Sequence, residues 1–268
     1  MDVYFISGQN YNIEDSKEVK VIRFEGNNSY MVKDTKNKQN GLNKYKKLNK
    51  NECVDTLTGE IIKYKEKEER DKSNMARSLT NLKYTIRNNF VGNGNELFIT
   101  LTTEYAIQDY DIVKNKAEKF IKELRQIYKG LEYIYVLELQ EDRNSWHIHI
   151  LLKDTIHETL YINYEEVNKL WGSNGTNIKH IYEIEGLANY FSKAETKTKI
   201  PRNKKMYYKS RGIKKAEIKK KIYKEFKEEV QGEYSLTNEY TLNIKNVQND
   251  YTINRVKTET WTNIHNKK

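Results

Sequence analysis

The run WHIHILL at residues 146–152 constrains the fold of this chain most strongly. Its apolar and β-branched residues predict a strand. Because side chains alternate between the two faces of a strand, His147 and His149 share one face, while Ile148 and Ile150 occupy the other. Two imidazoles on one strand face are either polar residues on a solvated surface or half of a metal site.

The segments before the histidines favour the metal site. Tyr133–Gln140 (YIYVLELQ) is strand-like and ends with two acceptor side chains, Glu138 and Gln140, on one face. An earlier run, Leu97–Thr103 (LFITLTT), alternates as a sheet strand does. These runs predict neighbouring strands that bring acceptors close to the imidazoles.

The segment Glu185–Lys193 (EGLANYFSK), which follows the histidines, has helical spacing. Leu187 and Phe191 would form its buried stripe, with Tyr190 and Lys193 together on the adjoining flank. The chain has 21 tyrosines, so packing is the simplest role for any single one. The rival nucleophiles, Tyr182, Tyr207 and Tyr208, are not followed by a lysine three residues later in such a setting.

In this order, FITLTT, ELQ, HIHILL and YFSK resemble the His-hydrophobe-His superfamily of single-strand DNA nickases. Within it, the sequence is most similar to the rolling-circle replication initiator (Rep) proteins of plasmids and phages. The segment Tyr207–Lys214 (YYKSRGIK) is similar to a Tyr/Ser-Arg-Gly segment that follows the nicking tyrosine in such initiators. The resemblance covers about residues 77–215, and HIHILL and YFSK are specific in combination.

The resemblance implies a metal-dependent endonuclease and strand transferase of the single-tyrosine type. Tyr190 would attack a DNA phosphate to give a 5′-phosphotyrosine and a free 3′-hydroxyl, and Lys193 would assist in orientation or proton transfer. His147, His149 and Glu138 would bind Mn²⁺ or Mg²⁺, and the open positions would take a phosphate oxygen. Such an enzyme also rejoins strands.

The loop between the two strands decides which acceptor reaches the metal. With an even connection, Glu138 lies opposite His149 and Gln140 opposite His147, all on one face. With an odd connection, Glu138 turns to the other face and Glu141 joins the histidines. The family pattern favours Glu138, and Gln140 and Glu141 stay open as additional ligands.

Charge is consistent with a polyanionic partner, since 48 Lys and Arg outnumber 38 acids to give a net charge of +10. An AT-rich coding sequence would also produce such a composition, so the charge permits DNA binding without demonstrating it. The expected partners are single-stranded DNA at the nick, the double-stranded replication origin, and a host helicase and polymerase. The candidate DNA-binding residues, in a stretch that could equally be a solvated basic surface, are Lys197, Arg202, Lys205, Tyr207, Tyr208, Lys209 and Arg211.

Several classes are excluded or disfavoured. The one cysteine, Cys53, excludes an intramolecular disulfide and a Cys-based zinc cluster. The chain has no apolar run of about eighteen residues and no signal-peptide pattern, so we expect a cytoplasmic protein without membrane contact. Leu151 replaces the third histidine of a histidine-triad hydrolase. A relaxase, a transposase of the same superfamily and a non-catalytic DNA-binding regulator remain alternatives.

The whole chain predicts an α+β fold with a central antiparallel sheet of about five strands and flanking helices. We expect an N-terminal extension at residues 1–70, a nicking domain at 71–215 and a basic C-terminal part at 216–268. Residues 33–69 are expected to be solvated, residues 216–230 to form a charged helix, and the tail to form a hairpin or an extra module. The other expected helices are 72–89, 112–128 and 164–170, and the other expected strands are 3–6, 19–24, 29–32 and 177–182.

Overall fold

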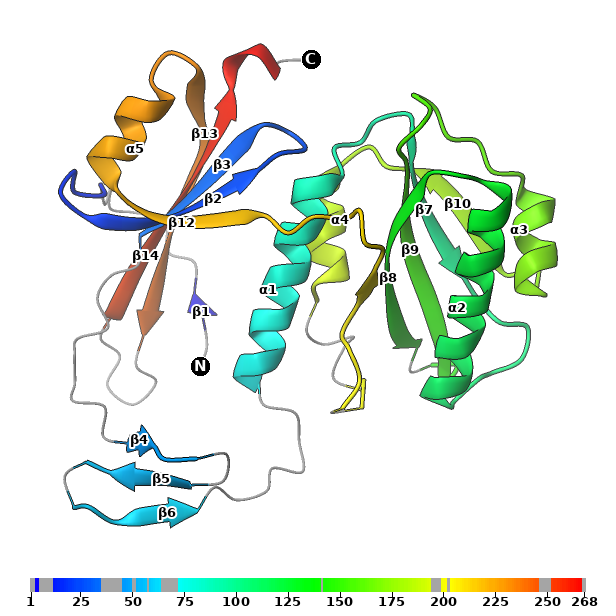
Figure 1. Ribbon diagram of the computed structural model, residues 1–268, viewed down its shortest axis with the longest axis horizontal. Coiled ribbons are helices and arrows are strands. Elements are labelled where there is room, and N and C mark those ends of the chain that lie inside the picture. The colour runs from blue at the N-terminus through cyan, green and yellow to red at the C-terminus, as the bar shows by residue number, and fades with distance from the viewer. Residues whose placement is uncertain are drawn as a thin grey trace. The chain divides into compact units, whose positions relative to one another are not determined.

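The computed structural model describes residues 3–4, 12–34, 45–49, 52–56, 58–63, 72–140, 142–193, 199–201, 203–245 and 252–266 (Figure 1). The chain divides into two compact units. One unit comprises residues 23–29 and 70–217, and the other comprises residues 1–22, 30–69 and 218–268. The boundaries expected at residues 70 and 215 stay a prediction, but strands from both expected extensions join one sheet.

The first unit is organised around a five-stranded antiparallel sheet, which confirms the predicted fold class. The strand order is β10-β7-β9-β8-β11. The two longest strands, β8 and β9, are neighbours near the middle, so each is hydrogen-bonded on both sides. The bounds are β7 Glu96–Leu101, β8 Leu131–Gln140, β9 Ser145–Asp154, β10 Thr176–His180 and β11 Tyr208–Lys209.

Helices α2 (Tyr110–Ile127) and α3 (Tyr164–Trp171) cover one face of this sheet. Helix α2 begins at an Asp109 cap, whose carboxylate accepts hydrogen bonds from two backbone N–H groups of the first turn. Its apolar stripe packs on the odd residues of β7 and β8 and the even residues of β9. This layer is the main hydrophobic core.

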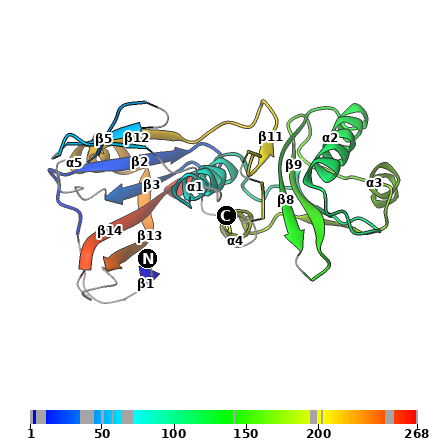
Figure 2. The same ribbon diagram turned by 90° about the horizontal axis from the view of Figure 1, so that it is seen from below.

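Helices α1 (Lys72–Asn89) and α4 (Ile184–Phe191) lie on the opposite face (Figure 2). Leu82, Ile86 and Phe90 pack with Ala188 and Phe191 in a second buried cluster. The sheet contributes Ile134, Val136 and Leu151 to this cluster. Residues two apart share a face, so this face of β8 and β9 also carries the polar residues of the predicted site.

The second unit contains a six-stranded sheet of order β1-β13-β14-β3-β2-β12. The predicted tail hairpin is present as β13 paired with β14. The helix expected over residues 216–230 is wrong in its first half: residues 217–222 form an edge strand beside β2, and the helix begins at Tyr223. The bounds are β1 Val3–Tyr4, β2 Glu18–Phe24, β3 Ser29–Asp34, β12 Glu217–Ile222, α5 Tyr223–Val230, β13 Tyr234–Lys245, β14 Thr252–Asn263 and a 3₁₀ turn, Ile264–Asn266.

The physical reason for that correction is pairing in the sheet. Ile218, which the helical pattern placed on a buried stripe, is 44% exposed, whereas Tyr223, Phe226 and Val230 are buried. The hydrogen bonds that residues 217–222 make beside β2 therefore outweigh the helix propensity of their lysine-rich sequence.

Part of the segment expected to be solvated is also ordered. Strands β4 (Tyr45–Lys47), β5 (Glu52–Asp55) and β6 (Ile61–Lys63) form a three-stranded antiparallel sheet in which Cys53 is buried. A high charge content hid these short strands, because alternation over three or four residues is a weak signal. Among the described residues, no helix is long and apolar enough to cross a membrane.

Candidate metal and nucleophile site

The hairpin β8–β9 sets the register of the site. Glu138 lies opposite His147, Gln140 opposite Ser145 and Val136 opposite His149. The even connection was correct in that Glu138 shares the histidine face, but the predicted pairing was wrong by two residues. The reason is that β9 begins at Ser145, because a four-residue loop closes with Asn144 in a left-handed conformation (φ 45°).

The shifted register places the Glu138 carboxylate diagonally beside His149. Oε2 of Glu138 lies 3.2 Å from Nε2 of His149, and the Tyr190 hydroxyl lies 3.2 Å from the same nitrogen. Diagonal neighbours on antiparallel strands are within reach of long side chains. The structure thus brings together a carboxylate, an imidazole and a phenol from β8, β9 and α4.

Two threonines of β7 and its C-terminal extension hold the other side of the imidazoles. Thr100 Oγ1 lies 3.2 Å from Nδ1 of His149, and Thr102 Oγ1 lies 3.4 Å from Nδ1 of His147. A carboxylate accepts hydrogen bonds, so the contact with Glu138 places a proton on Nε2 of His149, and its Nδ1 then accepts from the Thr100 hydroxyl. Both histidines therefore have their Nδ1 atoms engaged and direct their Nε2 atoms away from these threonines.

His147 is held neutral at physiological pH. Burial, and after it the nearby His149 and Arg143, lower the pKa of His147 below its usual range. Its Nε2 atom is buried and has no hydrogen-bond partner among the described residues. A neutral imidazole with an unsatisfied nitrogen is in the state that binds a metal ion.

Helix α4 positions Tyr190. Phe191 and Ala188 are fully buried, and burial of a phenylalanine side chain contributes about 1.5–3 kcal/mol. Near the N-terminal end of the helix, the Glu183 carboxylate accepts from the Gly186 N–H at 2.8 Å and caps the helix. Glu185 forms an ion pair with the buried Arg87 of α1, with Nε and Oε1 2.6 Å apart. Both ends of this short helix are thereby fixed, and Tyr190 turns to the sheet.

Tyr190 is protonated at neutral pH in this arrangement. Burial, and after it the negative charge of Glu138, raises the pKa of Tyr190 to about 12. Its ring packs in an edge-on arrangement against His149 and Phe98, with centroid separations of 5.4 and 6.5 Å. A reaction at this phenol requires positive charge to stabilise its phenolate.

The remaining predicted site residues are less closely associated. Lys193 is exposed and lies two residues beyond the end of α4, where its backbone N–H donates to the Tyr190 carbonyl. Gln140 shares the face of Glu138, and its Oε1 atom is buried without a hydrogen-bond partner in the described structure. Glu141 lies outside the described residues.

The metal site fits an ion in kind but not yet in spacing. No three His, Cys, Asp or Glu side chains in the described part of the chain are arranged to hold an ion directly. Glu138 and His149 instead contact each other. Two imidazoles and a carboxylate are nevertheless a suitable donor set for Mn²⁺ or Mg²⁺, and Nε2 of His147 has no hydrogen-bond partner in the described structure. Binding would require Glu138 to release His149.

The predicted DNA-binding residues divide between the two faces of the sheet. Tyr208 pairs with Tyr135 and stacks on it with a centroid separation of 4.7 Å, on the face covered by α2. Lys209 pairs with Ile134 and lies on the histidine face. Lys205 and Arg211 are exposed, and Tyr207 is half-buried. Lys197 and Arg202 lie outside the described residues.

The sequence reasoning missed Thr100 and Thr102 as partners of the histidines. Their alternation on one face of Leu97–Thr103 was visible, but their role depended on β7 being the neighbour of β9, with Thr100 opposite His149. Phe98, on the same face, contacts both His149 and Phe191. Strand order is a tertiary property, which the pattern within one strand does not give.

An α+β unit with two histidines, a carboxylate and a tyrosine on one sheet face is consistent with a Rep-type replication initiator. Residues 96–199 match the model of a family described as a replication-associated protein of the ORF2 type. The matched region contains Glu138, both histidines and Tyr190, and it ends before Tyr207. The match confirms the resemblance to replication initiators and indicates a role in replication initiation with interaction with DNA. No curated protein and no solved structure gives a significant match.

Proposed function

We propose that this protein is a rolling-circle replication initiator that nicks single-stranded origin DNA with Tyr190 as nucleophile. The observation that carries the proposal is the 3.2 Å contact between the Tyr190 hydroxyl and Nε2 of His149, on a face that also presents Glu138 and His147. The match of residues 96–199 to a replication-associated family supports the same reading. Packing alone does not require a buried phenol beside two imidazoles and a carboxylate.

A divalent ion is part of the proposal. His147, His149 and Glu138 would hold it, with Gln140 as an additional ligand, and Mn²⁺ or Mg²⁺ suits this mixture of nitrogen and oxygen donors. When bound, the ion would act as a Lewis acid on the phosphate and favour the phenolate of Tyr190. His147, kept neutral by burial, is ready to ligate without losing a proton.

The reaction transfers a phosphoryl group from a DNA 3′-oxygen to the tyrosine. The Tyr190 oxygen forms a bond to phosphorus, the bond from phosphorus to the 3′-oxygen breaks, and that oxygen takes up a proton to become a 3′-hydroxyl. Reversal of the same step rejoins strands. Lys193, exposed beyond the helix, is placed to contact the DNA backbone or to assist proton transfer.

Termination by hydrolysis does not carry over from the resemblance. Some initiators use a carboxylate one turn before the tyrosine, where this chain has Gly186. The two nearby acids have other contacts, because Glu183 caps α4 and Glu185 pairs with Arg87. We therefore propose strand transfer to a returning 3′-hydroxyl as the step that releases the protein.

The test is formation of a covalent protein–DNA adduct. The protein is incubated with a single-stranded origin oligonucleotide and Mn²⁺, and the products are separated on a denaturing gel. We expect an adduct with the native protein, none with Tyr190→Phe, and a strongly reduced amount with Glu138→Gln. Tyr182→Phe is a matched control, because Tyr182 is 87% exposed and lies just before α4.

The outcomes separate the candidate functions. A non-catalytic DNA-binding regulator would give a native mobility shift and no adduct. An undiminished adduct with Tyr190→Phe would assign the nucleophile to another residue. A relaxase or transposase would give the same adduct but would prefer a transfer-origin or transposon-end oligonucleotide over a replication origin.

A further inference from the structure

A groove of about 640 Å³ runs beside the first half of α1, within the unit that holds the five-stranded sheet. Four lysines, Lys204, Lys205, Lys209 and Lys215, line it, and among the described residues no Asp or Glu does. Met75 and Tyr207 provide an apolar and aromatic surface inside the basic rim. A cationic rim over an aromatic floor is the combination that holds single-stranded nucleic acid.

Two of the lysines are available to a ligand. Lys205 and Lys215 are exposed and have no ion-pair partner in the part of the chain that the structure describes. The Lys204 ammonium contacts the Asp111 carboxylate, and the Lys209 ammonium donates to the Ile213 carbonyl. The groove thus presents two free positive charges, with two others partly engaged.

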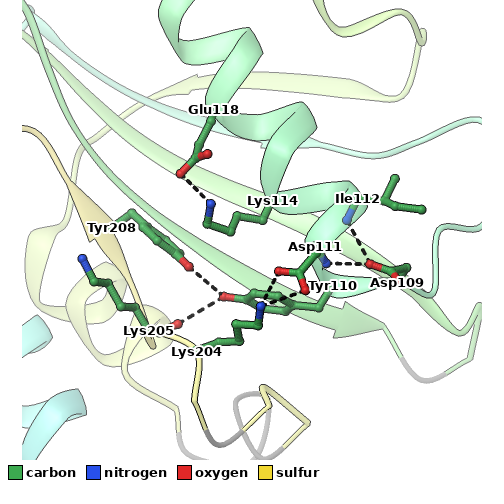
Figure 3. Close-up of polar contacts among 9 residues, drawn as sticks. All are labelled: Asp109, Tyr110, Asp111, Ile112, Lys114, Glu118, Lys204, Lys205 and Tyr208. Atoms are coloured by element: carbon green, nitrogen blue, oxygen red, sulfur yellow. Dashed lines mark hydrogen bonds and ion pairs between the residues drawn. The ribbon is translucent and has the colours of Figure 1, made fainter.

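The wall that carries these lysines is fixed before any ligand arrives (Figure 3). The Tyr110 hydroxyl, at the start of α2, donates to the Lys205 carbonyl at 3.3 Å, and the Tyr208 hydroxyl lies 3.2 Å from the Tyr110 hydroxyl. Lys204 reaches Asp111 in the same turn of α2. These contacts tie the backbone at residues 204–208 to a helix end, so little ordering remains to oppose binding.

The same contacts give Tyr207 and Tyr208 different roles. The Tyr208 ring is stacked on Tyr135 at an interplanar angle of 12°, so that face of the ring is covered. Tyr207 lines the groove and packs at the edge of the cluster that also contacts Tyr190. Tyr207 is therefore the aromatic residue of the pair that is placed for contact with a base on the histidine side.

The groove and the nucleophile share one face of the sheet. Lys209 lies opposite Ile134 on β8, and Glu138 lies four residues further along the same strand. At about 3.3 Å per residue, the separation between these positions is roughly 13 Å. A strand that contacts Lys209 can therefore continue along β8 to the phosphate beside Tyr190.

We propose that this groove binds the single-stranded DNA that flanks the nick. Lys205 and Lys215 contact backbone phosphates, while Tyr207 and Met75 contact a base and its sugar. The proposal rests on the proposed function for the identity of the strand. It assigns to one surface the lysines and the tyrosine that hold the substrate, and it leaves Tyr208 as a residue that positions the groove wall.

The test measures binding without chemistry. A fluorescent single-stranded oligonucleotide is titrated by anisotropy at several salt concentrations with Tyr190→Phe protein, to which we add Lys205→Gln and Lys215→Gln. We expect affinity to fall about fivefold or more and the slope of log affinity against log salt to fall by about 1.4, since each lost phosphate contact removes about 0.7. Lys205→Arg with Lys215→Arg should retain binding.

A matched control removes two positive charges elsewhere, with Lys119→Gln and Lys224→Gln, whose side chains are 75% and 65% exposed. An equal loss in this control, or an unchanged slope in the groove variant, would overturn the proposal. A loss confined to a duplex of the same sequence would overturn the single-strand assignment. Because the protein cannot react, a failed adduct assay with native protein would count against the proposed function alone.

Discussion

Thr100 and His149 face each other across the β7–β9 ladder, with Oγ1 of the threonine 3.2 Å from Nδ1 of the imidazole. Thr102 makes the corresponding contact with His147 at 3.4 Å. A partner on one ring nitrogen fixes the orientation of the ring and leaves the other nitrogen for a ligand. The two threonines therefore orient the two histidines.

Replacement of Thr100 by valine removes this hydroxyl with little change in shape. We expect Mn²⁺ affinity, measured by titration with electron paramagnetic resonance, to fall about 10- to 100-fold, as for other residues that support metal ligands. Thr100→Ser should restore most of it. Thr103→Val is the control, because the Thr103 hydroxyl contacts Ser145 and not a histidine. Unchanged Mn²⁺ affinity in Thr100→Val would contradict this role.

The ionisation of Tyr190 should respond to a bound cation. Burial and the Glu138 charge disfavour the phenolate and raise the pKa of Tyr190 to about 12. A divalent ion beside Glu138 acts in the opposite direction, so we expect saturation with Mn²⁺ to lower this pKa by about one unit or more. The measurement is an ultraviolet difference titration of the native protein against Tyr190→Phe, with and without Mn²⁺. An unchanged pKa would place the ion away from the phenol.

Asp154, at the end of β9, should make stability depend on pH. Burial opposes its charge, but hydrogen bonds from the Ile156 and His157 N–H groups and the His157 side chain outweigh burial, and the pKa of Asp154 lies below its usual range. A carboxylate with a lowered folded-state pKa stabilises the protein above its unfolded-state pKa, and this contribution is lost as pH falls through the folded-state pKa.

Asp154→Asn should therefore lower the free energy of unfolding by about 1–3 kcal/mol near pH 7. The difference from the native protein should shrink below about pH 4. Urea denaturation at both pH values measures it. Glu158→Gln, a nearby exposed acid, serves as the control and should show no such convergence. A deficit of equal size at low pH would mean that packing, not charge, accounts for the loss.

The sequence allowed the sheet and the site face to be predicted because both depend on alternation within single strands. His147, His149 and Glu138 share a face for this reason, and the apolar residues between them fill the core. Tyr190 could be placed because Phe191 fixes which side of α4 is buried. These are local signals, each contained in fewer than about twelve residues.

The errors came from relations between segments. The pairing of Glu138 with His147 depended on the backbone conformation of Asn144, and β12 formed because β2 offered an edge. The opposite orientation of Tyr208 and Lys209 follows from pairing of β11 with β8, which two residues cannot announce in advance. Registers and edges are set by the whole fold.

The brevity of β11 makes the spacing before it as important as its residues. Its two members alternate across the sheet, so inserting or deleting a single amino acid just upstream would exchange them. A lysine would then point toward α2, and an aromatic ring would enter the DNA side. Length variation here should consequently be far more damaging than substitution, and paired changes of two residues should be tolerated best.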